Sequence, residues 1–211
     1  FPPYELNIED GERLFNQRFK NGNTYSSCFE NSGIGIRQNY PYFDEDTGRV
    51  MTLELAINNC RKDNGEKPLS YYKGGPMADI SAYMAYTSRG NKFDVKIPNS
   101  QEALDAYEAG KKLYFTKVGQ LNFSCADCHV YQTGSKLRAD IPSPGIGHST
   151  HFPAYRSGAG RLVTLHERFA GCLNRVRAKP FKAQNEEYRN LEHFISYMSN
   201  GLEINGPGSR K

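Results

Sequence analysis

The sequence has no tryptophan, only four methionines and no long hydrophobic run. A membrane-spanning helix needs about 20 consecutive apolar residues, and the mean hydropathy is −0.71, so a membrane protein is excluded. The net charge of +4 over 211 residues lacks the dense basic clusters that nucleic-acid binding requires. It suits an anionic small substrate or an acidic protein partner. The chain begins without a basic, apolar leader, so we expect a cytosolic protein or one whose leader has been removed.

Cysteine is scarce, and the five that are present indicate the class of protein. Cys125, Cys128 and His129 form the pattern Cys-x-x-Cys-His, which is typical of c-type haem attachment. The two thiols bond to the vinyl groups of one haem, and the adjacent imidazole binds the iron from the proximal side. A zinc site would need two further ligands nearby, and a thioredoxin-like site a βαβ pattern; the sequence shows neither. We therefore predict one covalently bound haem c in an exported protein.

The second half of the chain repeats the first half. Residues 108–113, Glu-Ala-Gly-Lys-Lys-Leu, align with residues 9–14, Glu-Asp-Gly-Glu-Arg-Leu. Residues 164–181 align with residues 52–69, and the apolar stripe at 191, 194, 195 and 198 aligns with the stripe at 80, 83, 84 and 87. A glycine follows each stripe, as is typical of a helix end. Each half therefore contains an opening helix, a middle helix and a closing helix.

This order of helices resembles the cytochrome c domain, in which the first and last helices cross. We predict an all-α fold of two tandem cytochrome c-like domains, residues 1–95 and 96–211, with the boundary near residues 91–99. Capping residues at Asn7 and Ser100 are expected to begin the two opening helices.

The first domain is predicted to have lost its haem. Cys28 aligns with the second attachment thiol, but Tyr25 replaces the first thiol and Phe29 replaces the axial histidine. Cys60 is retained as the counterpart of Cys172. If the middle-helix cysteine faces the iron, loss of the haem leaves Cys28 and Cys60 in one vacated pocket. We predict a disulfide between them, which closes a loop of about 30 residues and stabilises the fold by a few kcal/mol.

Cys172 is then the odd thiol in the half that keeps its haem, where it can supply the distal axial ligand or the reactive group. The alternative is a buried, inert thiol. We assign Met198 to the core stripe and expect His193 to be solvated, while other histidines can ligate the iron or border the pocket: His148, His151 and His166. A thiolate on ferric haem lowers the potential of the iron, which does not suit high-potential electron carriage.

Basic residues surround Cys172 in the sequence. Between Tyr155 and Lys182 the single acid is Glu167, whereas the cations are Arg156, Arg161, Arg168, Arg175, Arg177, Lys179 and Lys182. Cations near a cysteine favour the thiolate and can bind an oxyanion such as a sulfonate. Arg168 lies one helical turn before Cys172, on the same face, and its counterpart in the first half is Ala56. We therefore predict that Arg168 belongs to the active site, although several of these cations will be solvated.

These stretches resemble the SoxA family of sulfur-oxidising bacteria. The resemblance covers nearly the whole chain and is most specific at residues 125–129, 151–156, 164–172, 177–181 and 191–201. Many members carry a second haem in the first half. Tyr25 and Phe29 depart from that pattern, so the chain resembles the monohaem members.

The resemblance implies a periplasmic L-cysteine S-thiosulfotransferase subunit. It pairs with the small cytochrome SoxX, and together they oxidatively couple thiosulfate to a cysteine of the carrier SoxYZ; a small accessory subunit is a further candidate partner. The resemblance further implies that His129 is the proximal ligand and that Arg168 binds substrate. It also implies that Cys172 is the distal ligand and the nucleophile, carried as a persulfide. Neither a nucleic acid nor a membrane is expected as a partner.

Two functions of other classes stay open. A plain electron-transfer cytochrome would have His/Met ligation and no substrate, and its absorption spectrum would show this. A thiosulfate dehydrogenase joins two thiosulfates to tetrathionate; such enzymes resemble this chain but keep two attachment motifs, and this sequence has one.

Overall fold

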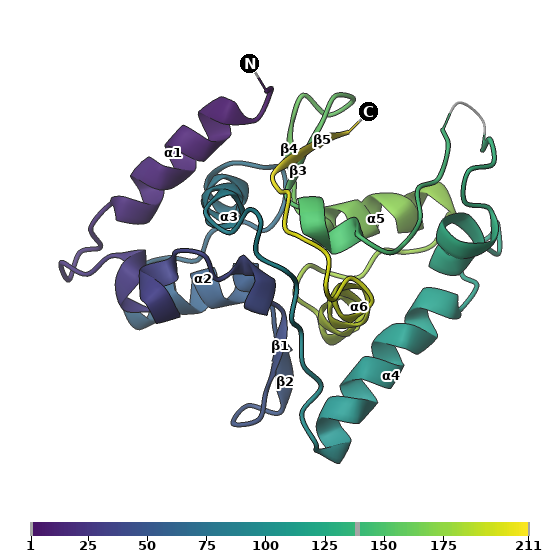
Figure 1. Cartoon of the computed structure of the whole chain (residues 1–211), viewed down its shortest axis with the longest axis horizontal. Helices are drawn as coiled ribbons and strands as arrows, with labels where there is room; N and C mark the ends of the chain where they lie inside the picture. Colours follow the sequence, from purple (N-terminus) through teal and green to yellow (C-terminus); the bar gives the residue numbers. More distant parts are fainter. Residues whose placement is uncertain (1, 138–139, 211) are drawn as a thin grey trace.

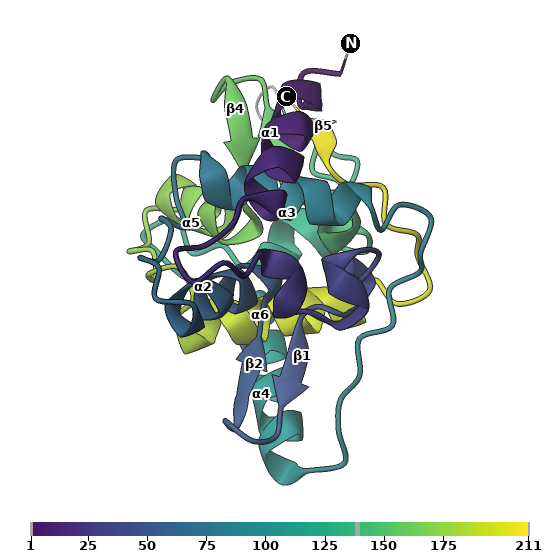
Figure 2. The ribbon, with the colours of Figure 1, turned by 90° about the vertical axis from the view of Figure 1, so that its left-hand side faces the viewer.

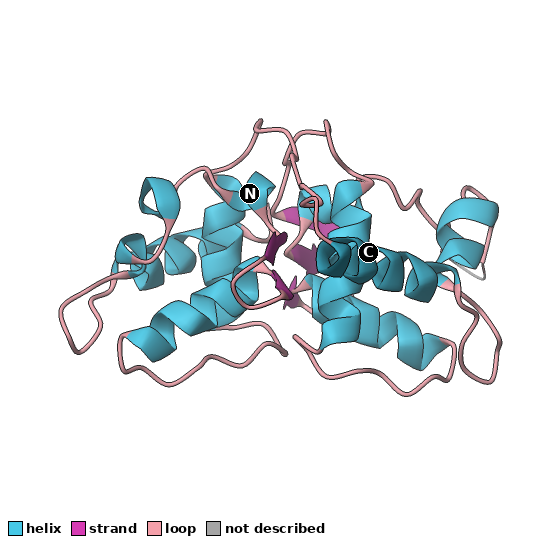
Figure 3. Ribbon diagram, turned by 90° about the horizontal axis from the view of Figure 1, so that it is seen from below, coloured by secondary structure: helices cyan, strands magenta, loops and turns pink. Residues whose placement is uncertain are grey.

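The computed structural model of the chain describes residues 2–137 and 140–210. It consists of two similar helical halves that lie side by side, with short strands between them (Figures 1 and 3). The helices of the first half are α1 (Glu5–Asn16), α2 (Leu53–Asp63) and α3 (Pro76–Tyr86). Those of the second half are α4 (Gln101–Phe115), α5 (Leu165–Arg175) and α6 (Glu186–Tyr197). Single turns of 3₁₀ or π-helix lie at Tyr25–Ser27, Glu30–Gly33, Arg37–Asn39, Asp127–Tyr131 and His148–His151.

The prediction of an all-α fold is wrong in one respect, because each half also contains a β-hairpin. The strands are β1 (Tyr42–Asp44), β2 (Arg49–Met51), β3 (Ala154–Arg156), β4 (Arg161–Val163) and β5 (Gly208–Arg210). The first pair forms one hairpin, while β4, β3 and β5 form the other sheet, with β5 parallel to β3. Strands of three residues are too short to show the alternation that predicts a strand. The two hairpins have the same register, offset by 112 residues: Asp44 faces Arg49, and Arg156 faces Arg161.

In each half the opening and closing helices cross in close contact, as the resemblance to the cytochrome c domain implies. A Cβ atom on Gly11 of α1 would lie 2.0 Å from the carbonyl oxygen of Asp79 in α3. A Cβ atom on Gly110 of α4 would lie 2.0 Å from the carbonyl oxygen of Asn190 in α6. Glycine is required at both positions because any side chain would collide with the backbone of the partner helix.

The two predicted helix starts differ in outcome. At Ser100 the N-cap is confirmed, because its hydroxyl accepts a hydrogen bond from the Ala103 N–H. At Asn7 the prediction is wrong, because α1 already begins at Glu5 after Tyr4. The Asn7 amide donates instead to the carboxylate of Asp79 at 2.7 Å, so it helps to fix the helix crossing.

Each half packs one short strand against a helix of the other half. Leu162 of β4 packs on α3 of the first half, and Val50 of β2 packs with Ala103 of α4 in the second half. The C-terminal segment returns along the connector between the halves (Figures 1 and 2), where the Phe93 N–H donates to the Leu202 carbonyl at 2.9 Å. These contacts fix the position of one half relative to the other.

A disulfide joins Cys28 to Cys60, with 5.7 Å between their Cα atoms. This is the pairing expected from the internal repeat. Tyr25, which is 1% exposed, stacks near Phe15 and Phe19 in the core beside it. An aromatic core and a cross-link therefore stand in the part of the first half that corresponds to the Cys-x-x-Cys-His segment of the second. No helix within residues 2–137 and 140–210 is long and apolar enough to cross a membrane.

Candidate active site

The Cys-x-x-Cys-His segment is held by a local hydrogen-bonded turn. Both the backbone N–H and the hydroxyl of Ser124 donate to the carboxylate of Asp127, at 2.8 and 2.9 Å. These hydrogen bonds lower the pKa of Asp127, which therefore stays ionised. The turn carries Cys125 and Cys128, neither of which forms a disulfide, and Cys125 packs against the core of the second half.

His129 is oriented by its own hydrogen bond. Its Nδ1 lies 2.8 Å from the Ser143 carbonyl oxygen, and because a carbonyl can only accept, Nδ1 carries the proton. The lone pair of the neutral imidazole is therefore on Nε2, which is the usual arrangement of a metal-binding histidine. The Gly145 N–H in turn donates to the His129 carbonyl at 2.9 Å, so the loop that supplies Ser143 is fixed to the same segment.

These residues fit a covalently attached haem c. The donor set is two thiols three positions apart and an imidazole with a free Nε2, which is what c-type attachment requires. The Tyr114 hydroxyl lies beside both thiols; it is buried and has no hydrogen-bond partner among the described residues. An unpaired buried hydroxyl at this point is consistent with a polar group of a cofactor.

Helix α5 brings a third thiol to the same place. The Thr164 hydroxyl caps α5 by accepting from the Glu167 N–H, and Cys172 lies two turns further along. Burial, and after it the neighbouring Cys172 thiol, raise the pKa of Cys125 to about 12, and the same two causes raise the pKa of Cys128. Cys172 itself is half-buried and is not in a disulfide. The structure therefore brings together all three cysteines of the second half.

Two of the histidines in the preceding loop lie near this group. The ring of His148 is 4.4 Å from that of His129, edge to face, and its Nε2 is 3.0 Å from the Ser143 hydroxyl. His151 is buried, and its Nδ1 donates to the Gly147 carbonyl. His148 therefore borders the site, and the ring of His151 lies 6.3 Å from that of His148. Met198 packs against the hydrophobic core, as the apolar stripe predicts.

His166 and His193 lie elsewhere, between the two halves. His166 Nδ1 accepts from the Gln184 N–H at 3.1 Å, and its Nε2 faces Glu192 at 3.0 Å. The expectation that His193 is solvated is wrong: it is 0% exposed, and its Nε2 donates to the Lys96 carbonyl. An apolar stripe marks one buried face of a helix, but α6 is surrounded by α4, α5 and β2, so its polar side is buried too.

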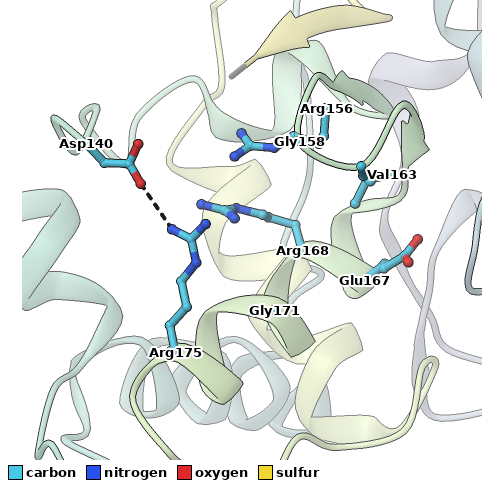
Figure 4. Close-up of a pocket in the computed structure, with 9 residues that line it drawn as sticks. Asp140, Arg156, Gly158, Val163, Glu167, Arg168, Gly171 and Arg175 are labelled. Atoms are coloured by element: carbon cyan, nitrogen blue, oxygen red, sulfur yellow. Dashed lines mark hydrogen bonds and ion pairs between the residues drawn. The ribbon is translucent and has the colours of Figure 1, made fainter. Parts of the chain in front are cut away.

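A cavity of about 330 Å³ opens beside α5 (Figure 4). Its walls are the β3–β4 hairpin, the exposed face of α5 and the loop that contains Asp140. The side chains of Arg156, Arg168 and Arg175 point toward one another in it. Gly171, which precedes Cys172, also lines the cavity, so the basic surface lies next to the third thiol.

The acids at this cavity are already paired. Arg161 donates two hydrogen bonds to Glu167, at 3.0 and 2.6 Å, and the Lys73 N–H from the first half adds a third at 3.2 Å. Asp140 forms an ion pair with Arg175 at 3.3 Å. The cations of the sequence thus have different roles: Arg161 and Arg175 neutralise acids, while Arg168 faces the cavity without a carboxylate partner among the described residues.

Several contributors to the site could not be found from the sequence. Tyr114, Ser143 and the backbone of Lys73 act through positions that only the folded chain brings together. The loop of Lys73, Gly74 and Gly75 does have one signal, a pair of glycines, and all three residues adopt positive φ angles. That conformation is typical of a tight loop placed against a neighbour.

Known proteins resemble this chain over nearly its whole length. The family model described as SoxA/TsdA, cytochrome c domain, matches residues 10–93 and 109–204. The L-cysteine S-thiosulfotransferase subunit SoxA of Chlorobaculum tepidum is 56% identical over 211 residues, which are 100% of this chain and 73% of that protein. The protein of the same name from Allochromatium vinosum is 55% identical over 212 residues, covering 100% of this chain and 75% of that protein.

A solved structure has the same fold. The crystal structure of SoxXA from P. pantotrophus superposes with a TM-score of 0.89 and 33% sequence identity, and the match covers 99% of this chain and 79% of that chain. The overall fold of this chain is therefore that of a chain in the SoxXA structure.

Proposed function

The chain belongs to the SoxA/TsdA cytochrome c family, and we propose that it is the SoxA-type subunit of a periplasmic L-cysteine S-thiosulfotransferase. Its partner is a small cytochrome of the SoxX kind, since the superposed crystal structure is that of SoxXA. Its substrates are thiosulfate and the cysteine of a SoxYZ-type carrier. The observation that carries the proposal is Cys172, a thiol outside any disulfide that lies beside the attachment thiols and next to an arginine-lined cavity.

One haem c is held by the second half. Cys125 and Cys128 would attach it, and the free Nε2 of His129 and the sulfur of Cys172 would bind its iron. When bound, the haem would supply the capacity to accept electrons. The first half takes no haem, because Tyr25 and the disulfide partner Cys28 use the corresponding segment for packing and cross-linking.

The residues of this chain then perform sulfur transfer. The Cys172 sulfur and the outer sulfur of thiosulfate form a sulfur–sulfur bond, with loss of two electrons to the cytochromes, and leave a thiosulfonate on Cys172. The carrier thiolate attacks the thiosulfonate sulfur that is bonded to the Cys172 sulfur. The bond between these two sulfurs breaks, so that the carrier takes over the thiosulfonate and the Cys172 thiolate is released. Overall, a carrier thiol and thiosulfate give the carrier S-thiosulfonate, one proton and two electrons. A Cys172 persulfide undergoes the same exchange through its terminal sulfur.

Product analysis tests this function. The haem-loaded chain, isolated with its small cytochrome partner, is incubated with carrier, thiosulfate and an electron acceptor. We expect the intact mass of the carrier to rise by one thiosulfate unit, less the proton of its thiol. An unmodified carrier together with tetrathionate in solution would show a thiosulfate dehydrogenase instead.

Arg168 is expected to bind the sulfonate end of thiosulfate. A charge-assisted bidentate contact contributes roughly 1.5–3 kcal/mol, so Arg168→Ala should lower kcat/KM on the order of ten- to a hundredfold. Arg168→Lys keeps the charge without the planar fork and should lie between wild type and Arg168→Ala. The haem absorption spectrum should be the same in all three proteins. A shifted spectrum or potential with unchanged affinity for thiosulfate would instead assign Arg168 to a haem propionate.

A further inference from the structure

We infer that Arg156 is a second substrate-binding residue. Together with Arg168 it forms a binding site, the anion seat, for a small, doubly charged oxyanion. The inference rests on the proposed function, because it names the charge of the substrate that this site accepts. Arg156 ends strand β3, whereas Arg168 lies in the second turn of α5, and both side chains are half-buried. They come from different elements and converge in the same cavity (Figure 4).

The acids at the cavity form ion pairs with other arginines and leave Arg156 and Arg168 without one among the described residues. Glu167 is turned toward Arg161, which holds both of its carboxylate oxygens. Asp140 is engaged by Arg175 in a pair whose side chains are 68% and 58% exposed. Neither Arg156 nor Arg168 has an acidic partner within residues 2–137 and 140–210. Two adjacent guanidinium groups without a direct ion-pair partner are the chemistry that recognises a dianion.

The first half of the chain serves as an internal control for this arrangement. Its hairpin and α2 have the same lengths and register as the hairpin and α5 of the second half, at a constant offset of 112 residues. The three cavity arginines have no basic counterpart there, because the corresponding residues are Asp44, Ala56 and Asp63. The same backbone therefore folds without these cations, so folding does not require them.

The arginine at position 156 also has an electrostatic cost. It lies directly opposite Arg161 on β4 and beside Arg210 on β5, and like charges at such positions are destabilising. In the first half the equivalent pair is Asp44 opposite Arg49, which is favourable. Burial, and then the charges of Arg168 and Arg175, lower the pKa of Arg156. A bound anion would relieve this repulsion.

Thiosulfate matches the seat in charge. It carries two negative charges, and the cavity of about 330 Å³ has room for its five heavy atoms. The carboxylates of a haem are a second source of negative charge that could meet the same guanidinium groups. Experiment can separate the two sources because only free anions compete with substrate.

The test measures equilibrium binding of sulfate, a dianion that cannot react, and of methanesulfonate, a monoanion. Calorimetry on the haem-loaded chain with its small cytochrome partner compares wild type, Arg156→Gln, Arg156→Lys and the control Arg49→Gln. Arg49 is an exposed arginine of the first hairpin, so its loss changes the net charge equally. Arg156→Gln should weaken sulfate binding on the order of ten- to a hundredfold and abolish the preference for sulfate. Arg156→Lys should be intermediate, and Arg49→Gln should bind like wild type.

The outcomes distinguish failure of the anion seat from failure of the proposed function. Unchanged sulfate binding in Arg156→Gln overturns the seat, even if the wild type modifies the carrier normally. A shift of the haem potential with unchanged sulfate binding also overturns it, and assigns Arg156 to a haem carboxylate. Weakened sulfate binding supports the seat even if no carrier is modified, in which case the proposed function fails instead. Thermal unfolding verifies that Arg156→Gln folds, as the hairpin with Asp44 already does.

Discussion

Replacement of Cys172 by alanine is expected to abolish conjugation of thiosulfate to the carrier, with a loss of turnover on the order of a thousandfold or more. The sulfur that forms and gives up the thiosulfonate is then missing, and no other thiol of the second half is free once the haem is attached. Folding and haem content should be nearly unchanged, because Cys172 is half-buried and forms no disulfide. The measurement is carrier mass against time, together with haem content per chain.

The matched control is the pair of cysteines in the other half. Cys60 is the repeat counterpart of Cys172, but it is bonded to Cys28. The double variant Cys28→Ala, Cys60→Ala should lower the free energy of unfolding by about 3–4 kcal/mol, because the cross-link no longer restricts the unfolded chain. It should conjugate thiosulfate at the wild-type rate at temperatures where it stays folded. Retained activity in Cys172→Ala, or lost activity in the folded double variant, would place the reactive thiol elsewhere.

Gly110→Ala is expected to cause a large loss of stability. The new methyl group would lie 2.0 Å from the Asn190 carbonyl oxygen and 3.0 Å from the Leu191 nitrogen, both backbone atoms of α6. Since a backbone cannot rotate out of the way as a side chain can, α4 and α6 must move apart. We expect the free energy of unfolding to fall by roughly 3 kcal/mol, the upper part of the range for overpacking. Urea unfolding of the haem-loaded protein measures this.

The repeat provides the controls for that experiment. In Gly11→Ala the new methyl group would lie at the same 2.0 Å from the Asp79 carbonyl oxygen, so the free energy of unfolding should fall by a similar amount. Gly158→Ala has no atom within 4 Å of the new methyl group and should leave the free energy of unfolding within about 0.5 kcal/mol of wild type. Equal stability of all three variants would mean that the helices do not cross at these glycines.

Much of the helical framework could be predicted because its signals are local. The apolar stripe of α6 and the cap at Ser100 each depend on residues within a few positions, and the internal repeat extends a signal in one half to the other. The same alignment pairs Gly11 with Gly110, and both glycines lie at the helix crossings. The pairing of Cys28 with Cys60 is a long-range contact, but the repeat makes it predictable, because it aligns these residues with Cys128 and Cys172 of the other half.

Features that depend on contacts between the halves could not be predicted. The burial of His193 arises because α6 packs against α4 and α5 and also against β2 of the first half, and both hairpins pack on the opposite half. The distinct roles of the arginines belong to the same class. Sequence alone presents them as one basic run, whereas the fold turns Arg161 to Glu167 and leaves Arg156 beside Arg168.

Peptide-resolved mass spectrometry of the native, unreduced chain tests the central claim most directly, namely that one half performs the chemistry and the other supports it. We predict a single haem on the peptide that contains Cys125 and Cys128. Cys28 and Cys60 should be cross-linked, and Cys172 should be found as a thiol or a persulfide. A second haem in the first half, free thiols at Cys28 and Cys60, or Cys172 in a disulfide with either of them would contradict the account.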